Sequence, residues 1–211
     1  QGVIDETHPI RGLLKGRPFD ARLTEMEVMT NIRAAVIAPK RDQQRVSNFL
    51  SQLQQTAEPT KWDADYLLPF PGFSSAFKCS LEVSQGGGGF VGLEEPEDLS
   101  PRAARALSAQ IATALASLKA SVNPSLTSIY IPARWAALKA YETETEYFDL
   151  HDFVKASAIP RGCATQFLEE DTMTHQQQCR VRWWLSLATY AKAMRSPWAL
   201  HGLDKDSAYV G

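Results

Sequence analysis

The sequence lacks the features that mark several large classes of protein. Its three cysteines form no CxxC pair and no metal-ligand spacing, so they indicate the reduced thiols of a cytosolic protein. No apolar run approaches the length of a membrane span, and no signal peptide opens the chain. The formal net charge of −2 argues against a general nucleic-acid coat, but it leaves room for a focused binding pocket. We therefore expect a cytoplasmic protein with no membrane partner.

The apolar residues that are present recur in a strand-and-helix pattern. The chain has 211 residues and is 44% hydrophobic, which is enough for one sizeable domain with a real core. Apolar runs that predict buried strands cover residues 31–39, 77–83, 126–131 and 163–168. Amphipathic patterns that predict helices cover residues 41–55, 101–120, 150–158 and 177–194. This alternation predicts an α/β fold, a Rossmann-like doubly wound, mostly parallel sheet flanked by helices.

Three other patterns suggest chemistry but lack the residues that would support it. The glycine run Gly86–Gly89 is not followed by Lys and Ser or Thr, so a flexible loop explains it better than a phosphate cradle. Cys163 and His151 would suit a thiol nucleophile, but no matching acid accompanies them, which favours a buried structural cysteine. The alternating glutamates of YETETEYF (residues 141–148) are expected to face solvent rather than to form a paired carboxylate site.

Four residues in the last third of the chain share one chemical purpose. They are His151, Lys155, Gln166 and Lys192. His151 and Lys155 are one helical turn apart on one face, and Lys192 lies near the edge of the apolar side of its helix. A lysine there is costly unless an anion meets it or its stem reaches solvent. Ammonium groups and an amide suit a terminal phosphate, and an imidazole can stack under a base. On spacing alone, however, ordinary solvated side chains on helix flanks explain these residues better.

The order of these residues resembles a known family. His-x3-Lys, a Gln eleven residues on and a Lys twenty-six further resemble the guide 5′-end pocket of Argonaute MID domains. The neighbouring segments ATQFL, YAK, PWAL and DSAYVG are also similar to Argonautes, and DSAYVG resembles the opening of a PIWI domain. Near the other end, HPIRGLLKGRPF resembles the start of short prokaryotic Argonautes, which lack the N and PAZ domains.

The resemblance implies an organisation and a function. It implies a leader at residues 1–30, a MID domain at 31–200 and the start of a PIWI domain at 201–211. His151, Lys155, Gln166 and Lys192 would then anchor the 5′-phosphorylated end of a guide RNA or DNA that pairs with a complementary target in prokaryotic defence. A divalent ion, usually Mg2+, would help to hold the phosphate, with Gln166 as the one ligand we can suggest.

The same resemblance implies that this chain is a binding module and not an enzyme. Any slicer activity would belong to a PIWI domain. Effector activity would belong to a partner protein that carries a PAZ-analogous segment and a TIR, sirtuin-like or nuclease domain. Whether the guide is RNA or DNA, and whether the chain is a fragment or a split subunit, stays open. The alternative from another class is an α/β small-ligand sensor or enzyme domain that uses the same edge of the sheet.

Overall fold

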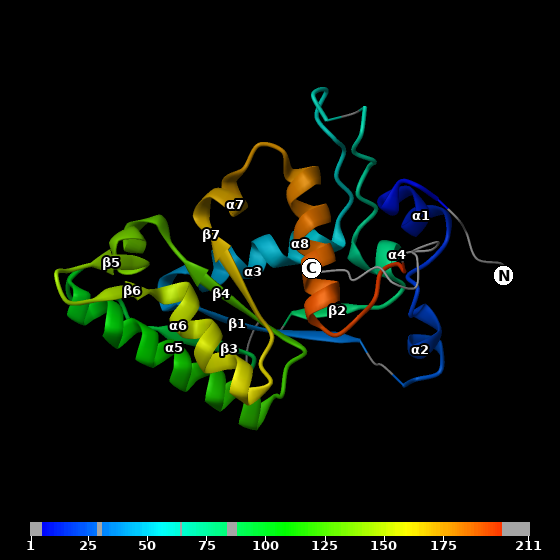
Figure 1. Ribbon diagram of the computed structural model, residues 1–211. Helices are drawn as coiled ribbons and strands as arrows, with labels where there is room; N and C mark the ends of the chain where they lie inside the picture. The colour runs from blue at the N-terminus through cyan, green and yellow to red at the C-terminus, as the bar shows by residue number, and fades with distance from the viewer. Residues whose placement is uncertain (1–5, 29–30, 64, 84–87, 200–211) are drawn as a thin grey trace, which may run out of the picture.

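A parallel sheet forms the centre of the molecule. The computed structural model describes residues 6–28, 31–63, 65–83 and 88–199 (Figure 1). The strand order is β2-β1-β4-β7, and β3 also pairs with β1. The strands are β1 (Ile32–Pro39), β2 (Leu81–Val83), β3 (Phe90–Leu93), β4 (Leu126–Ile131) and β7 (Thr165–Glu169). All these pairings are parallel, which confirms the predicted sheet.

Strand β1 occupies the middle of the sheet because it is apolar on both faces. Every residue of the strand except Arg33 is buried. Ala34 and Val36 belong to the core on one face of the sheet, whereas Ala35 and Ile37 belong to the core on the other. Successive side chains of a strand point to opposite faces, so such a run suits a strand covered on both sides.

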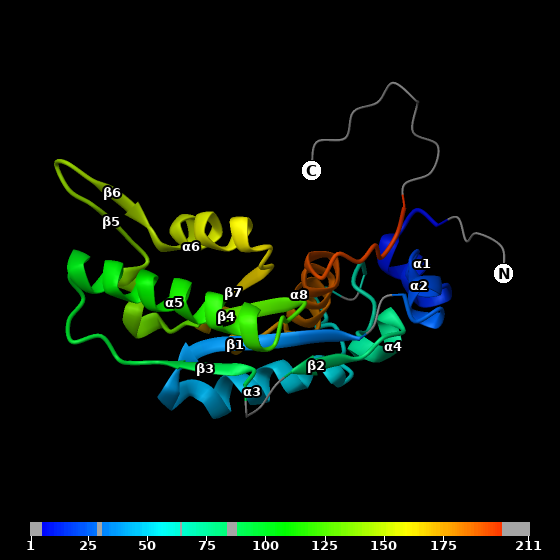
Figure 2. The ribbon, with the colours of Figure 1, turned by 90° about the horizontal axis from the view of Figure 1, so that it is seen from below.

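Helices cover both faces of this sheet. Figure 2 shows α5 and α6 on one side of the sheet and α3 on the other. One core contains residues of α1 (Pro9–Lys15), α3 (Gln43–Ser51), α4 (Phe73–Phe77) and α8 (Gln178–Lys192). The second core contains residues of α5 (Pro101–Ser121), the 3-10 helix η3 (Ala133–Leu138) and α6 (Leu150–Ala158). This two-sided covering confirms the predicted doubly wound α/β fold.

The edge beside β1 differs from the prediction. We expected one strand at residues 77–83, but Phe77 ends helix α4 and only Leu81–Val83 is extended. Strand β2 pairs with the first half of β1, and β3 pairs with its second half. The edge is therefore built from two short strands on either side of the glycine run. The amide of Val36 donates to the carbonyl of Gly89 at 2.8 Å where the second of these strands begins.

Several short elements lie outside the predicted pattern. Residues of the expected leader fold into α1 and α2 (Ala21–Glu25), and the polar break contains α7 (Glu170–Thr174). Strands β5 (Ala140–Glu142) and β6 (Tyr147–Asp149) form an antiparallel hairpin. The remaining 3-10 turns are η1 (Lys40–Asp42), η2 (Gln52–Gln54) and η4 (Ile159–Arg161). The division at residues 30 and 200 stays a prediction, and residues 201–211 lie outside the described part.

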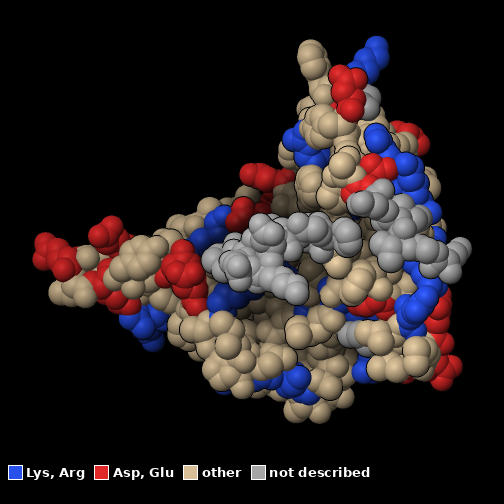
Figure 3. Space-filling model, turned by 45° about the vertical axis from the view of Figure 1, so that its right-hand side comes forward, with Lys and Arg blue, Asp and Glu red and all other residues tan. Residues whose placement is uncertain are grey.

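The hairpin corrects one prediction about the alternating glutamates. Glu142 and Glu144 are exposed as expected, and acidic side chains gather at the projecting end of the molecule (Figure 3). Glu146 instead pairs with Arg105 of α5 and accepts a hydrogen bond from the Tyr141 hydroxyl at 3.1 Å. None of the described helices is both long and apolar enough to cross a membrane.

Gly72 permits the turn into α4, and its replacement tests the local geometry. Its φ is +90°, and a Cβ added there would lie 2.5 Å from the backbone oxygen of Gln54. Gly162 also has a positive φ, +60°, but the atom nearest to its added Cβ is Lys119 Nζ at 3.9 Å. We expect Gly72→Ala to lower the free energy of unfolding by about 3 kcal/mol and Gly162→Ala by about 1 kcal/mol. Urea denaturation would measure both, and equal losses would contradict the close approach at Gly72.

Candidate functional site

Two lysines from different helices meet on one backbone oxygen. Lys155 Nζ, from α6, donates to the carbonyl of Thr165 at 2.9 Å and to its hydroxyl at 2.8 Å. Lys192 Nζ, from the last residue of α8, donates to the same carbonyl at 3.1 Å. Since α6 belongs to one core and α8 to the other, the lysines approach from opposite faces of the sheet.

The carbonyl of Thr165 is available because β7 is an edge strand. The amide of Thr127 in β4 donates to the carbonyl of Ala164 at 2.9 Å, so that carbonyl faces into the sheet. Successive carbonyls of a strand point in opposite directions, so the carbonyl of Thr165 faces away from β4. An outward carbonyl at a partly buried edge needs a donor, and the two lysines supply it.

Gln166 completes the cluster. Its Oε1 accepts a hydrogen bond from Lys192 Nζ at 2.6 Å, and its Nε2 donates to the carbonyl of Phe167 at 2.8 Å. Gln166 is the second residue of β7, near the amino end of the strand. Doubly wound sheets usually bind ligands beyond the carboxyl ends of their strands, whereas this cluster lies along the outer edge of the sheet.

Neither lysine has an acidic partner in the part of the chain that the structure describes. No carboxylate there lies within the 4.0 Å of a salt bridge to either ammonium group. Because both nitrogens reach one oxygen, they lie within about 6 Å of each other, where like charges repel by about 3 kcal/mol at an effective dielectric constant of about 20. Burial lowers the pKa of Lys155. Burial and then the charge of Lys155 lower the pKa of Lys192.

The cluster keeps hydrogen-bonding capacity for a ligand. An ammonium group has three N–H bonds, and the contacts to Thr165 and Gln166 use two on each lysine. One N–H on each group therefore has no acceptor among the described residues. Two partly desolvated positive charges with spare donors favour an anion, because its charge would offset both the burial and the repulsion.

His151 lies beside this cluster, and its hydrogen-bond partner among the described residues is Asp152 rather than a residue of the cluster. It precedes Lys155 by one turn of α6, and its side chain is largely exposed. The ring centroid is 5.1 Å from that of Phe167, with the planes at 51°. Its Nδ1 is 3.3 Å from Asp152 Oδ1. The structure thus brings Lys155, Gln166 and Lys192 together and leaves the imidazole near the cluster and accessible.

Among the described residues, the contacts of this cluster do not point to a metal site. Gln166 Oε1 already accepts from an ammonium group, which is a poor setting for a dication. Ligand atoms of Asp149, His151 and Asp152 lie within 4.8 Å of one another, but this group is at the start of α6, and His151 and Asp152 are exposed. There Asp149 caps the helix by accepting from the amide of Asp152 at 3.0 Å. The suggested role of Gln166 toward Mg2+ therefore finds no support in its contacts, and we derive no chemistry through the ion.

Sequence reasoning missed Thr165, and arginine and tryptophan side chains of α8 make other contacts. Thr165 acts largely through its backbone oxygen, which has no signature in a sequence. Arg180 pairs with the buried Asp63 at 2.5 Å, and Arg182 donates to the carbonyl of Thr56 at 2.9 Å. These contacts hold the loop before α4 against α8. Trp183 is fully buried, and its indole donates to the carbonyl of Leu68 at 2.8 Å.

Comparisons with known proteins add little to this geometry. No protein-family model matches the sequence, and no curated protein sequence matches it. Among solved structures, the chain is similar to Clostridium butyricum Argonaute bound to a guide DNA and a 19-mer target DNA, at 11% identity and a TM-score of 0.42. The likeness covers 92% of this chain and 23% of that one, so the chain spans less than a quarter of that protein. A likeness this weak carries no argument for function.

Lys192 has no acidic partner among the described residues, and this leads to a prediction about stability. We expect Lys192→Met to leave the free energy of unfolding unchanged or to raise it by up to about 1 kcal/mol, because it removes a desolvated charge. The carbonyl of Thr165 keeps Lys155 as its donor. The matched control is Arg195→Met, three residues on, since Arg195 is buried and lies 3.2 Å from Asp20. Its loss should cost about 3 kcal/mol.

Chemical denaturation at neutral pH would measure both variants. Equal destabilisation would mean that Lys192 serves the fold rather than a ligand.

Proposed function

We propose that this chain binds the 5′-phosphorylated end of a small guide RNA or DNA. The observation that carries the proposal is the meeting of Lys155 and Lys192 on the carbonyl of Thr165, where neither has a carboxylate partner among the described residues. A terminal phosphate supplies negative charge and several acceptor oxygens. These match two ammonium groups that each keep one N–H without an acceptor in the described part of the chain. The ordered set of residues that resembles the Argonaute guide pocket supports the same ligand.

Each residue has a distinct role in this proposal. Lys155 and Lys192 bind phosphate oxygens, and the carbonyl of Thr165 holds both ammonium groups in place before the ligand arrives. Gln166 orients Lys192 and offers its amide to the phosphate once its bond to Phe167 opens. The exposed ring of His151 stacks on the first base, which any base permits.

The wider role follows from the anchored guide. Base pairing to a complementary target would then read the sequence of invading nucleic acid. The chain itself would act as a binding module. Any slicer or effector chemistry would belong to a PIWI domain or to a partner with a PAZ-analogous segment and a TIR, sirtuin-like or nuclease domain.

Phosphate preference tests this proposal directly. The measured quantity is the ratio of the dissociation constants of a 5′-hydroxyl and a 5′-phosphoryl oligonucleotide of one sequence at fixed salt. A charge-assisted contact contributes about 1.5–3 kcal/mol, so Lys155→Ala or Lys192→Ala should lower this ratio roughly ten- to a hundredfold. His151→Ala should weaken both oligonucleotides alike, because the ring contacts the base and not the phosphate.

The controls separate a guide end from other ligands. Binding of the 5′-hydroxyl oligonucleotide should change little in either lysine variant, since lysine and phosphate act as one unit. An unchanged ratio in both variants would show that the lysines are ordinary surface charges. Tight binding of a phosphorylated mononucleotide without further gain from a longer chain would favour a small-ligand sensor or enzyme domain.

The lowered lysine pKa values give the preference a pH dependence. Only charged lysines attract the phosphate, and burial lowers the pKa of both below the ordinary 10.5. The preference should therefore fall as pH rises through these lowered values, beginning below 10.5. A DNA oligonucleotide withstands the alkaline end of the titration.

Arginine variants provide the control for this titration. Lys155→Arg and Lys192→Arg keep their charge over the whole range, so combining them should remove the pH dependence. A preference that falls only above the ordinary lysine range, or falls equally in the arginine variant, would rule out these two groups as its source.

A further inference from the structure

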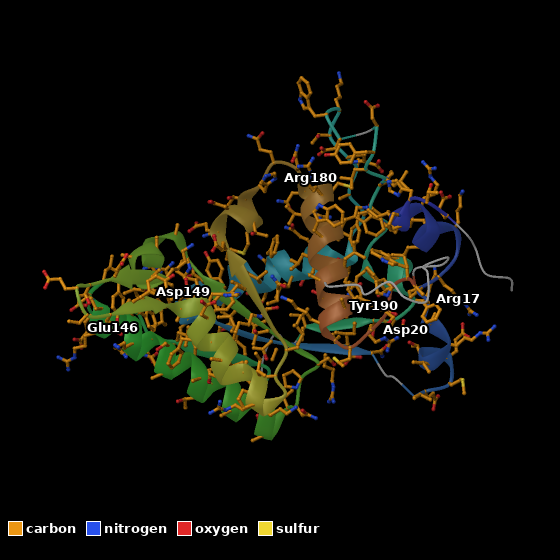
Figure 4. All side chains as sticks on the ribbon, in the orientation of Figure 1. Arg17, Asp20, Glu146, Asp149, Arg180 and Tyr190 are labelled. Carbon is orange, nitrogen blue, oxygen red and sulfur yellow. The ribbon has the colours of Figure 1, made fainter. Side chains whose placement is uncertain are left out.

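A buried ionic cluster ties the expected leader to the end of α8. Asp20 accepts a hydrogen bond from the Tyr190 hydroxyl at 2.5 Å. The same carboxylate accepts from the amide of Ser196 at 2.8 Å, and Arg195 Nε lies 3.2 Å away. Asp20, Tyr190 and Arg195 are all buried. Figure 4 shows Asp20 beside Tyr190 at one end of α8, with Arg180 at the other end.

Backbone contacts extend this connection. The amides of Phe19 and Asp20 donate to the carbonyls of Pro197 and Ser196, at 3.1 and 3.3 Å. Arg195 also donates to the hydroxyl of Thr24 in the leader. The leader thus lies along the segment that follows α8, although about 170 residues of sequence separate them. Such a pairing fixes the direction in which the chain leaves the helix.

Tyr190 connects the buried ionic cluster to helix α8. Its ring stacks on Phe77 with the centroids 4.6 Å apart, and the Arg195 guanidinium lies 5.3 Å from its centroid. Burial raises the pKa of Tyr190, so the phenol stays a neutral donor to the Asp20 carboxylate. A buried charge pair is retained at a desolvation cost, and one established use of such pairs is to fix a single geometry.

The anchored residue and the candidate ligand residue belong to the same turn of α8. Tyr190 and Lys192 are two positions apart, which places them about 200° apart around the helix, on nearly opposite sides. One side is held by Asp20 and the other by the contacts of Lys192 to β7. The last turn of α8 is therefore fixed between the leader and the edge strand.

We propose that Asp20 is a positioning residue for Lys192, so that the leader is part of the framework of the phosphate site. Asp20 touches neither lysine and no ligand; it fixes the turn of α8 from which Lys192 reaches Thr165. This inference rests on the proposed binding of a 5′-phosphate. A displacement of a charged group by a fraction of an ångström to 1 Å is enough to weaken a preorganised contact.

Asp20→Asn tests the proposal, and the other end of α8 offers a matched control. Asp63 is also buried, and it accepts from Arg180 at 2.5 Å and from the Tyr66 hydroxyl at 2.5 Å. Asp63→Asn therefore removes the same kind of ionic anchor from the same helix, far from Lys192. We expect Asp20→Asn to lower the 5′-phosphate preference roughly tenfold with little change for the 5′-hydroxyl oligonucleotide. Asp63→Asn should leave the preference unchanged.

The alkylation rate of Cys79 tests whether Asp20 holds the end of α8 in place, and this test needs no ligand. Cys79 is buried, which raises its pKa to about 11, and the charges of Arg195 and Asp20 act on it. Alkylation followed by peptide mapping should show Cys79 reacting faster in Asp20→Asn than in the unmodified chain or in Asp63→Asn. Cys179, buried near the other end of α8, should stay protected in Asp20→Asn if the protein remains folded.

A milder variant keeps the test informative if Asp20→Asn does not fold. Tyr190→Phe removes the hydrogen bond to Asp20 and keeps the ring on Phe77, so it should lower the preference several-fold in the same direction. An unchanged preference in folded Asp20→Asn or in Tyr190→Phe, or an equal loss in Asp63→Asn, would overturn the positioning role. If the unmodified chain shows no phosphate preference, the proposed function fails, and the positioning role fails with it.

Discussion

The outer edge of β7 is the constraint on which the candidate site depends. A parallel sheet ends in a strand whose outward carbonyls have no partner strand, and here the carbonyl of Thr165 is covered by side chains instead. The helices on the two faces each send one lysine over the edge. Two like charges are thereby brought onto one oxygen, at a cost that a neutral donor would have avoided. An anion bound at this edge would attract both ammonium groups and so offset their mutual repulsion.

The distribution of paired and unpaired charges on α8 supports this interpretation. Arg180 near the start of the helix pairs with Asp63, and Arg195 just beyond its end pairs with Asp20. Lys192 lies between these two arginines in the sequence, and it has only neutral acceptors among the described residues. The ionic pairs fix both ends of the helix in place, and the lysine is left with charge and donors to spare. Stability and binding are thus assigned to different residues of one helix.

The core of the fold was predictable from sequence, because burial on both faces leaves a continuous apolar run. Residues 32–39 and 126–131 are strands for this reason, and the side chains of Ser100 and Asp149 cap the helices that begin directly after them. The split edge strand was not predictable in this way, since β2 and β3 are short and pair with β1 on either side of the glycine run. The hairpin of β5 and β6 was missed because its alternating glutamates indicate solvent exposure and give no sign of a paired strand.

The site was predictable only in part. Spacing placed His151 and Lys155 on one face of a helix, but it could not relate them to Lys192, and only the family resemblance did so. Thr165 and Asp20 were missed for different reasons: one acts largely through its backbone, and the other joins residues about 170 positions apart.

Direct titration of the lysine side chains by NMR tests the central claim, that Lys155 and Lys192 form a desolvated anion site. Signals of the two ammonium groups would be assigned from the arginine variants. In the free protein, we expect both pKa values to lie below those of the exposed lysines, because burial lowers them. Addition of a 5′-phosphorylated oligonucleotide should raise both values, and its 5′-hydroxyl counterpart should not. The account would be contradicted if both groups titrated in the same pH range as the exposed lysines and if the phosphorylated oligonucleotide left their pKa values unchanged.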